Sequence, residues 1–541
     1  MTIFIQRALG LCLVFFILSC TQQKEYPEFS PWSPYDETAL IDSSQSNENP
    51  RLRYKLLQSK VADKNDMLES IRIQLDGFNN QTYIDLSPLI YEKTIPELQQ
   101  AIDDKLLTYK RLTQWYLYRI ATLEPTLDYG LNAVITINPN VVEAAEKLDR
   151  MAAIDHHPIF GMPVLLKDNI STKGLKTTAG ALALNKNIPT QDAHIVQNLN
   201  KHNALILGKA NLSEWANFLC QGCPNGYSAV GGQTLNPYGM RAFDTGGSSS
   251  GSGAGIAANY AVAAVGTETS GSILSPASQN ALVGLKPTVK PEHQKGIVPI
   301  SGTLDTPGPM SKSVVDNAIL YSAMFDQPYA ELTKVAPQSL RLGVLKNYMT
   351  DSLYQRSVDL LEAKDVEFIT LEPKQMDFSG FLELLNGDMK VDLRYFLASY
   401  ASDSVDVKSV KDVVEFNLKD TLVRIPYAQA RLDGVVEQDF SEVQMDSIRQ
   451  KLLTAGKTFF ATLFKEHDLD AVLSINNYNA GQAAVARYPA LTINMGFTDA
   501  GEPKGLTFIG EPDQEQSLLQ LAKFYEDVSK FRKAPEKFEV K

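Results

Sequence analysis

The sequence predicts a globular protein that combines helices with buried strands, and three observations support this class. Of its 541 residues, 44% are hydrophobic and 21% are charged, a balance that lets the chain bury a sizeable core. The apolar run at 164–166 is short enough for a buried strand. By contrast, residues 51–76 and residues 316–325 (DNAILYSAMF) have helical character. Length alone suggests about three domains.

The first twenty residues have the pattern of an export signal. Arg7 is followed by the apolar stretch ALGLCLVFFILS and then by Cys20. This arrangement is typical of a signal peptide, and the stretch is shorter than the roughly 20 apolar residues that a membrane-spanning helix needs. ILSC at 17–20 resembles a bacterial lipobox, which implies that Cys20 is lipidated and anchors the protein in the cell envelope. Thr21 favours the outer membrane by analogy. An ordinary secretory signal is the alternative, and it too exports the body of the protein.

Two segments separate this signal from the main body. Residues 21–50 are rich in Ser, Asn, Pro and Glu, a composition that predicts a flexible tether to the membrane. Residues 51–90 are predicted to form an N-terminal helical extension.

A lysine at the end of the predicted strand is the first candidate for chemistry. The segment PVLLKDNI (163–170) leads directly to Lys167, which is followed by Asp168 and Asn169. A lysine at the end of a buried strand is partly desolvated, which lowers the pKa of its ammonium group. The alternative is a surface lysine that caps the strand end.

The most informative stretch runs from Gly246 to Ser272, GGSSSGSGAGIAANYAVAAVGTETSGS. Its six serines fall in two clusters, 248–252 and 270–272. Glycine permits close backbone approach, and N–H groups freed in such a loop can point at an anionic oxygen. A serine there is a candidate nucleophile with an oxyanion hole beside it. A flexible Gly/Ser linker is the alternative, against which the apolar segment AGIAANYAVAAVG argues.

A nucleophilic serine needs a base, and this chain is poor in histidine. None of its six histidines lies in a motif typical of a Ser-His-Asp enzyme. Lysine is another known activator of serine, which makes Lys167 the candidate base. Because an unperturbed lysine has a pKa of about 10.4, this role requires a pKa lowered to near 7. We therefore expect the Asp168 carboxylate to point away from Lys167, towards backbone N–H groups.

Cysteines and charge limit the other functional classes. Cys220 and Cys223 form a CxxC pair that can become a disulfide in an oxidising compartment. A zinc site would need two further ligands, and no nearby pair is evident, so no metal is expected. The net charge of −12 and the pI near 5.2 offer no basic surface for nucleic acid.

These motifs, in this order, resemble the amidase signature family of serine hydrolases. The resemblance is carried by TIPELQQAI (94–102), PIFGMPVLLKDNI (158–170), NLSEWANF (211–218), GGSSSGSG and GTETSGSI (246–273), GIVPISGTLDTPGPM (296–310) and YPALTINMGF (488–497). It implies one amidase signature domain over residues 91–541, with an α/β fold in which helices flank a large, mixed, twisted β-sheet (α/β/α).

The resemblance also implies a role for individual residues. Lys167 matches the family's catalytic lysine, Ser248 the bridging serine that follows a cis peptide bond, and Ser272 the nucleophile. The matching oxyanion hole consists of the backbone N–H groups of Thr269, Ser270, Gly271 and Ser272. The implied reaction is hydrolysis of a carbon–nitrogen amide bond through an acyl-enzyme, with release of ammonia or an amine and with no cofactor.

Small departures from the family pattern indicate a branch. Ser250 and Leu274 stand where many members have Gly and Arg. These variants are similar to a bacterial branch that includes peptide amidases, which release ammonia from C-terminal peptide amides. That branch often has Asp at the position of Ser270, so the peptide-amide assignment is open. The expected partner is a small amide or peptide amide, together with the membrane through the lipid anchor.

Two alternatives to an exported amidase remain. One is a non-catalytic binding lipoprotein on an amidase scaffold. The other is a tRNA-dependent amidotransferase A-like subunit, which export disfavours because charged tRNA lies inside the cell. The sequence leaves open the oligomeric state and the choice among a peptide amidase, an aryl or aliphatic amidase, and an esterase.

Overall fold

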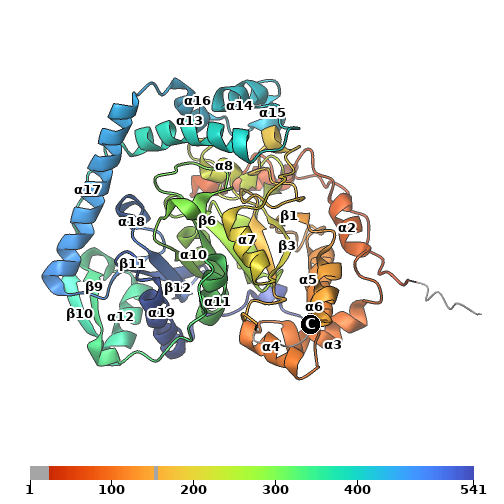
Figure 1. Ribbon diagram of the computed structural model, residues 1–541, viewed down its shortest axis with the longest axis horizontal. Coiled ribbons are helices and arrows are strands. Elements are labelled where there is room, and N and C mark those ends of the chain that lie inside the picture. The colour runs from red at the N-terminus through yellow and green to blue at the C-terminus, as the bar shows by residue number, and fades with distance from the viewer. Residues whose placement is uncertain (1–23, 152–155, 541) are drawn as a thin grey trace, which may run out of the picture.

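The structure is a computed structural model that describes residues 24–151 and 156–540 (Figure 1). The predicted signal peptide and the lipidation site Cys20 lie outside the described residues and stay predictions. Within the described ranges, no helix is long and apolar enough to cross a membrane.

Eleven strands of the described chain form one sheet, in the order β1-β3-β2-β6-β8-β7-β12-β13-β11-β9-β10. Parallel pairs (β2 with β3 and β6, and β9 with β10 and β11) are combined with antiparallel ones, so the predicted large mixed sheet is confirmed. The strands are β1 Val134–Ile137, β2 Pro163–Lys167, β3 Leu205–Ala210, β6 Ala263–Glu268, β7 Val283–Lys286, β8 Thr306–Ser311, β9 Arg341–Leu345, β10 Glu367–Leu371, β11 Ala471–Ile475, β12 Ala490–Phe497 and β13 Pro503–Ile509, with β4 Tyr227–Ser228 and β5 Gly232–Gln233 paired separately.

Helices cover this sheet. α9 packs against β2, β3 and β6, whereas α11, α12 and α19 pack against β6–β8, β12 and β13. α13, α14, α15 and α16 gather at the top of Figure 1, and the long α17 runs from them down one side of the molecule. The helices are α1 Thr38–Ser44, α2 Lys64–Arg72, α3 Asn80–Ile90, α4 Ile95–Asp103, α5 Tyr109–Leu123, α6 Val141–Asp149, α7 His194–Lys201, α8 Glu214–Asn217, α9 Ser250–Ala257, α10 Leu274–Gln279, α11 Val314–Met324, α12 Ser352–Glu362, α13 Phe381–Ser399, α14 Val410–Asn417, α15 Thr421–Arg424, α16 Ala430–Glu437, α17 Glu442–His467, α18 Ala480–Ala486 and α19 Glu515–Ser529.

The centre of the sheet brings several chain segments to one edge. β2, β3 and β6 run parallel, so their carboxyl ends at Lys167, Ala210 and Glu268 lie together. β8 runs antiparallel to β6, and its first residue, Thr306, pairs with Glu268. Loops at the carboxyl ends of parallel strands are the usual position for a binding site in an α/β sheet.

The expectation of a flexible tether over 21–50 does not hold for the described part of that segment. The Phe29 ring packs against Tyr118, with ring centroids 5.7 Å apart. The Trp32 N–H donates to the Asn65 side chain at 2.8 Å. These aromatic side chains give the Ser/Pro-rich segment apolar surface to bury, which a true tether lacks.

The N-terminal extension is helical only in part. Within residues 51–76, the α-helix is confined to α2, which begins where the Asp63 side chain accepts the N–H of Asn65. The N–H groups of Leu57 and Gln58 instead donate to the Glu37 carboxylate. Those backbone donors are therefore satisfied without a helix.

Candidate active site

Lys167 lies at the end of β2 with no solvent exposure. Its Nζ is 2.7 Å from Ser248 Oγ, 2.8 Å from Thr267 Oγ1 and 3.0 Å from the Thr267 carbonyl oxygen. Burial lowers the pKa of Lys167 to about 7, against the opposing effect of the Asp305 and Glu268 carboxyl groups. The alternative of a surface lysine is therefore wrong.

The three contacts of Lys167 match the three hydrogens of an ammonium group, and they are also compatible with an uncharged amine. A neutral amine has two hydrogens and one lone pair. The Thr267 carbonyl can only accept a hydrogen bond, and Thr267 Oγ1 also accepts from Asn169 Nδ2 at 3.0 Å. If both amine hydrogens go to Thr267, the lone pair of Lys167 faces the Ser248 hydroxyl, which can then donate.

Asp168 points away from Lys167, as expected. Its carboxylate accepts the backbone N–H of Thr178 at 2.9 Å and the Thr178 hydroxyl, and lies 3.9 Å from Lys209 Nζ. Burial raises the pKa of Asp168, while Lys209 and Thr178 favour its charged form. The carboxylate nearest to Lys167 in sequence is thus engaged elsewhere.

Ser248 is fully buried at the turn that leads into α9. The Gly247–Ser248 peptide bond is cis, as the family resemblance implied. The Ser248 carbonyl accepts the N–H of Ser213 at 3.1 Å. Gly246 has a φ of +69°, and a Cβ there would lie 2.7 Å from the Pro276 backbone, so only glycine fits.

Ser272 lies where the second serine cluster meets the first. Its carbonyl accepts the Ser249 N–H at 3.2 Å, and its side chain borders a cavity of about 500 Å³. Ser272 retains 8% exposure, whereas Ser248 has none. In the described ranges, the Ser272 hydroxyl makes no hydrogen bond, to Ser248 or to any other group.

The loop before Ser272 differs from the expectation at one position. The Glu268 carboxylate accepts the N–H groups of Gly271, Ile273 and Leu274 at 2.6, 2.7 and 3.0 Å. The Gly271 N–H is therefore not free to bind an oxyanion, because the Glu268 carboxylate already accepts it. The N–H groups of the other three predicted donors have no acceptor in the described part of the chain; they belong to Thr269, Ser270 and Ser272.

Asp305 holds this loop through Thr269, a role that the sequence motifs did not indicate. Its carboxyl group accepts the Thr269 hydroxyl at 2.5 Å and the N–H groups of Ile300 and Ser301 at 2.8 and 3.0 Å. Burial raises the pKa of Asp305 to about 7. Asp305 lies in GTLDTPG, which is part of the motif at 296–310. The motif therefore marked the segment as similar to the family, but it did not indicate what Asp305 does. Thr267 and Asn169 were missed in the same way.

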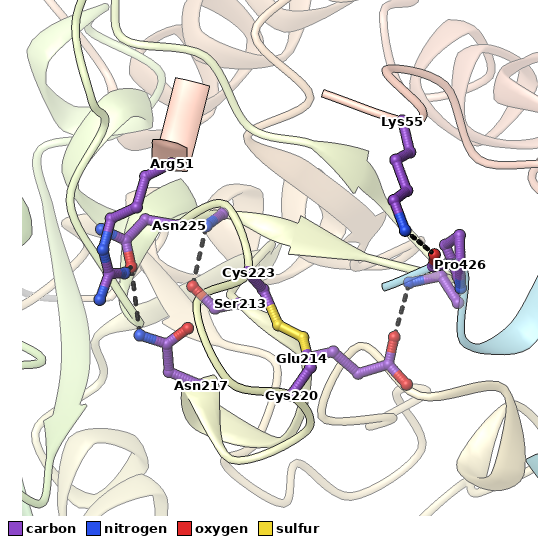
Figure 2. Close-up of a disulfide and its surroundings, with 11 residues drawn as sticks. Arg51, Lys55, Ser213, Glu214, Asn217, Cys220, Cys223, Asn225 and Pro426 are labelled. Atoms are coloured by element: carbon purple, nitrogen blue, oxygen red, sulfur yellow. Dashed lines mark hydrogen bonds between the residues drawn. A yellow bond between two sulfur atoms is a disulfide. The ribbon is translucent and has the colours of Figure 1, made fainter. Parts of the chain in front are cut away.

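The cavity wall includes the CxxC pair. Cys220 and Cys223 are joined as a disulfide, and both border the cavity (Figure 2). The same loop is tied to the site, because the Gly226 N–H donates to Ser213 Oγ at 2.8 Å. Among the described residues, no group of three or more His, Cys, Asp or Glu side chains could hold a metal ion.

The remaining lining of the cavity contains both apolar and charged side chains. The apolar side chains are Ala216, Phe218, Ile300, Phe381, Leu382 and Leu385. The charged side chains are Arg51, Asp244 and Arg431. Asn477 also borders the cavity, which places the stretch 476–484 beside the site.

Comparisons with known proteins agree with this geometry. The family model described as Amidase matches residues 111–519. The chain is 32% identical to a protein described as "probable amidase" from Arabidopsis thaliana, over 87% of this chain and 96% of that protein. Its fold is similar to an amidase family protein from Bacillus anthracis (TM-score 0.83, 34% identity, 89% of this chain and 100% of that one). It is also similar to native peptide amidase from Stenotrophomonas maltophilia (TM-score 0.74, 32% identity, 83% and 99%).

Proposed function

Because the chain belongs to the amidase family and is thus a hydrolase of carbon–nitrogen amide bonds, we propose that Ser272 is its nucleophile, with Ser248 as proton bridge and Lys167 as base. The observation that carries this assignment is the 2.7 Å contact between a buried, pKa-lowered Lys167 and Ser248. A lysine with a lowered pKa, no carboxylate within 4.0 Å in the described chain and a serine hydroxyl at 2.7 Å is suited to accept a proton.

The proposed reaction runs through two acyl transfers. Lys167 takes the Ser248 proton, Ser248 takes the Ser272 proton, and a bond forms between Ser272 Oγ and the amide carbon. The carbon–nitrogen bond then breaks, and the proton returns through the same relay to the departing ammonia or amine. Water repeats the sequence on the acyl-enzyme, which releases a carboxylic acid and restores the Ser272 hydroxyl. The Ser272 side chain must rotate towards Ser248 for this relay, and such contacts often tighten only with substrate bound.

Three backbone donors are available for the tetrahedral intermediate. Among the described residues, the N–H groups of Thr269, Ser270 and Ser272 have no acceptor, and Asp305 holds the loop through Thr269. One such donor typically contributes about 3 kcal/mol to the transition state. In this proposal Glu268 and Asp305 act as positioning residues, because they fix the loop without reaching the substrate.

We propose primary amides as substrates, including the C-terminal amides of short peptides. The 32% identity to a peptide amidase supports this class, and a cavity of about 500 Å³ is large enough for a small peptide. Serine at position 270 sets this chain apart from the Asp that is common in that branch.

Ammonia release tests the proposal. Purified protein should release ammonia from primary amides, and Ser272→Ala should abolish release while thermal unfolding stays unchanged. Equal release by wild type and Ser272→Ala would contradict the assignment. A folded protein that hydrolyses no amide would favour a binding lipoprotein on an amidase scaffold.

We also propose that the protein is exported and anchored in the cell envelope through Cys20. The support is the sequence pattern of residues 1–20. Full-length protein should partition with the membrane fraction, and Cys20→Ala should move it to the soluble exported fraction. Recovery of both in the cytosol would contradict this localisation.

A further inference from the structure

The cavity that contains Ser272 carries positive side chains that the proposed chemistry does not use. Two of its three charged lining residues are arginines, although the chain as a whole has a net charge of −12. This feature bears on which amide the site accepts, so the inference rests on the proposed function.

Arg51 reaches the cavity from the N-terminal segment. It lies in a short 3-10 helix, Pro50–Leu52, which precedes the region matched by the family model. Its Nη1 donates to Asn225 Oδ1 at 2.6 Å, which places the side chain beside the disulfide loop (Figure 2). A guanidinium has five N–H donors, and this contact uses one of them. Within the described chain, Arg51 forms no ion pair within 4.0 Å, so donors remain for a ligand.

Arg431 reaches the cavity from α16. Its guanidinium carbon lies 6.0 Å from the centre of the Phe218 ring. No hydrogen bond or ion pair of its side chain occurs in the described part of the chain. At 6.0 Å the guanidinium lies at the outer limit of a cation–π contact with Phe218, so its N–H groups are free for a planar anion.

The third charged group, Asp244, interacts electrostatically with Arg51 but accepts its hydrogen bonds from other groups. Both oxygens of the Asp244 carboxylate accept from Asn225 Nδ2, at 3.1 and 2.9 Å, and one of them also accepts the Gly246 N–H at 2.8 Å. Burial raises the pKa of Asp244, whereas Arg51, Asn225 and the Gly246 N–H favour its charged form. Asp244 therefore holds Asn225, and through it Arg51, in place.

We propose that the substrate is a primary amide whose acyl part carries a carboxylate, bound by Arg51 and Arg431. When the leaving group is ammonia, all other parts of the substrate belong to the acyl part, so the carboxylate must lie there. Arginine binds carboxylates through paired, charge-assisted hydrogen bonds. The apolar side chains that line the cavity, among them Phe218, Phe381 and Leu385, suit a substrate that also carries a hydrophobic group.

Matched pairs of amides test this inference. The first pair is acetyl-Glu-Phe-amide and acetyl-Met-Phe-amide, which are similar in size, differ in charge and each have a single primary amide. The second pair is the monoamide of adipic acid and hexanamide. Wild type should hydrolyse the carboxylate member of each pair with a kcat/KM about tenfold higher or more, given the usual strength of a hydrogen bond to a charged group.

Variants of the two arginines separate recognition from catalysis. Arg51→Gln and Arg431→Gln should each lower kcat/KM for the carboxylate member about tenfold and change the neutral member by less than about threefold. Arg53→Gln is the matched control: Arg53 lies two residues from Arg51, donates to the Asn47 carbonyl and does not border the cavity. It should leave both members unchanged.

The outcomes distinguish this inference from the proposed function. Equal kcat/KM for the two members of each pair, or equal losses on both in the arginine variants, would overturn the inference alone. So would labelling of Ser272 by a fluorophosphonate without turnover of any carboxylate-bearing amide. Absence of both labelling and turnover would overturn the proposed function itself.

Discussion

Lys167 and Lys209 are two fully buried lysines on neighbouring strands, and they have different partners. Lys209, on β3, lies 3.9 Å from the Asp168 carboxylate and donates to Thr177 Oγ1 at 2.9 Å and to the Ile170 carbonyl. Lys167, on β2, meets hydroxyl and carbonyl oxygens but no carboxylate within 4.0 Å in the described chain. Burial lowers the pKa of Lys209 to about 8 and that of Lys167 to about 7.

In the proposed mechanism, this difference in partners, and not burial alone, distinguishes the base Lys167 from Lys209. Lys209 compensates a buried carboxylate, and its hydrogens are directed at fixed acceptors. Lys167 has one contact, Ser248 Oγ, that can reverse direction and deliver a proton. We therefore propose that Lys209 stabilises the fold and that Lys167 acts as the base.

The largest expected effect is the loss of activity in Lys167→Met. Removing a general base typically lowers the rate about 10³-fold, so kcat/KM for a primary amide should fall by that order. Stability should not fall, because methionine of similar volume removes a buried amine whose pKa of about 7 lies below the ordinary 10.5 and so opposes folding at neutral pH. Comparison of kcat/KM with the thermal midpoint checks both parts. Activity close to wild type would contradict the assignment of Lys167 as the base.

Lys209→Met should show the opposite pattern. Removal of one partner of a buried ion pair leaves Asp168 without a counter-charge and should lower the free energy of unfolding by about 3 kcal/mol. Denaturant titration measures this loss, and the double variant Lys209→Met/Asp168→Asn should recover much of it. A Lys209 variant that is stable yet inactive would contradict the division of roles.

The pH dependence of kcat/KM tests whether the reacting base has the lowered pKa of Lys167. Because the folded-state pKa of Lys167 is lowered to about 7, its neutral form prevails above that pH and its ammonium form below it. The rate should therefore be level above about pH 7 and fall about tenfold per unit below it. A rate that continues to rise towards pH 10 would indicate a lysine with its ordinary pKa.

The smallest expected effect concerns the carboxyl groups near the two lysines. Asp305 favours the ammonium form of Lys167, so Asp305→Asn should move the acid limb of the profile to lower pH, by less than about one unit. Asp168→Asn should leave the limb in place, because Asp168 faces Lys209. Equal shifts in the two variants would show that the lysines are not electrostatically distinct.

The sequence allowed prediction of those parts of the site that are local in the chain. Lys167 follows an apolar run, and Ser248 and Ser272 lie in an unusual Gly/Ser stretch that resembles a known family. Lys209 was not predicted as the partner of Asp168, because the two meet only through the pairing of β2 with β3. The positions of Asp168 and Lys209 in the sequence do not indicate that the two side chains meet.

Two other differences have similar causes. The N-terminal segment was predicted to be flexible from its composition, yet Phe29 and Trp32 dock it on the body. A few aromatic side chains outweigh the average composition of a segment. The Gly271 N–H was predicted to be a free donor, whereas Glu268 accepts it, a contact that depends on how the loop after β6 folds back.

The most direct test of the account is covalent labelling with a fluorophosphonate probe. The account predicts that peptide mapping finds the label on Ser272, that Ser272→Ala abolishes labelling and that Lys167→Met slows it greatly, whereas the probe labels a folded Lys209→Met protein at the wild-type rate. Labelling of a different serine, or equal slowing in the two lysine variants, would contradict the central claim that Lys167 and Ser248 activate Ser272.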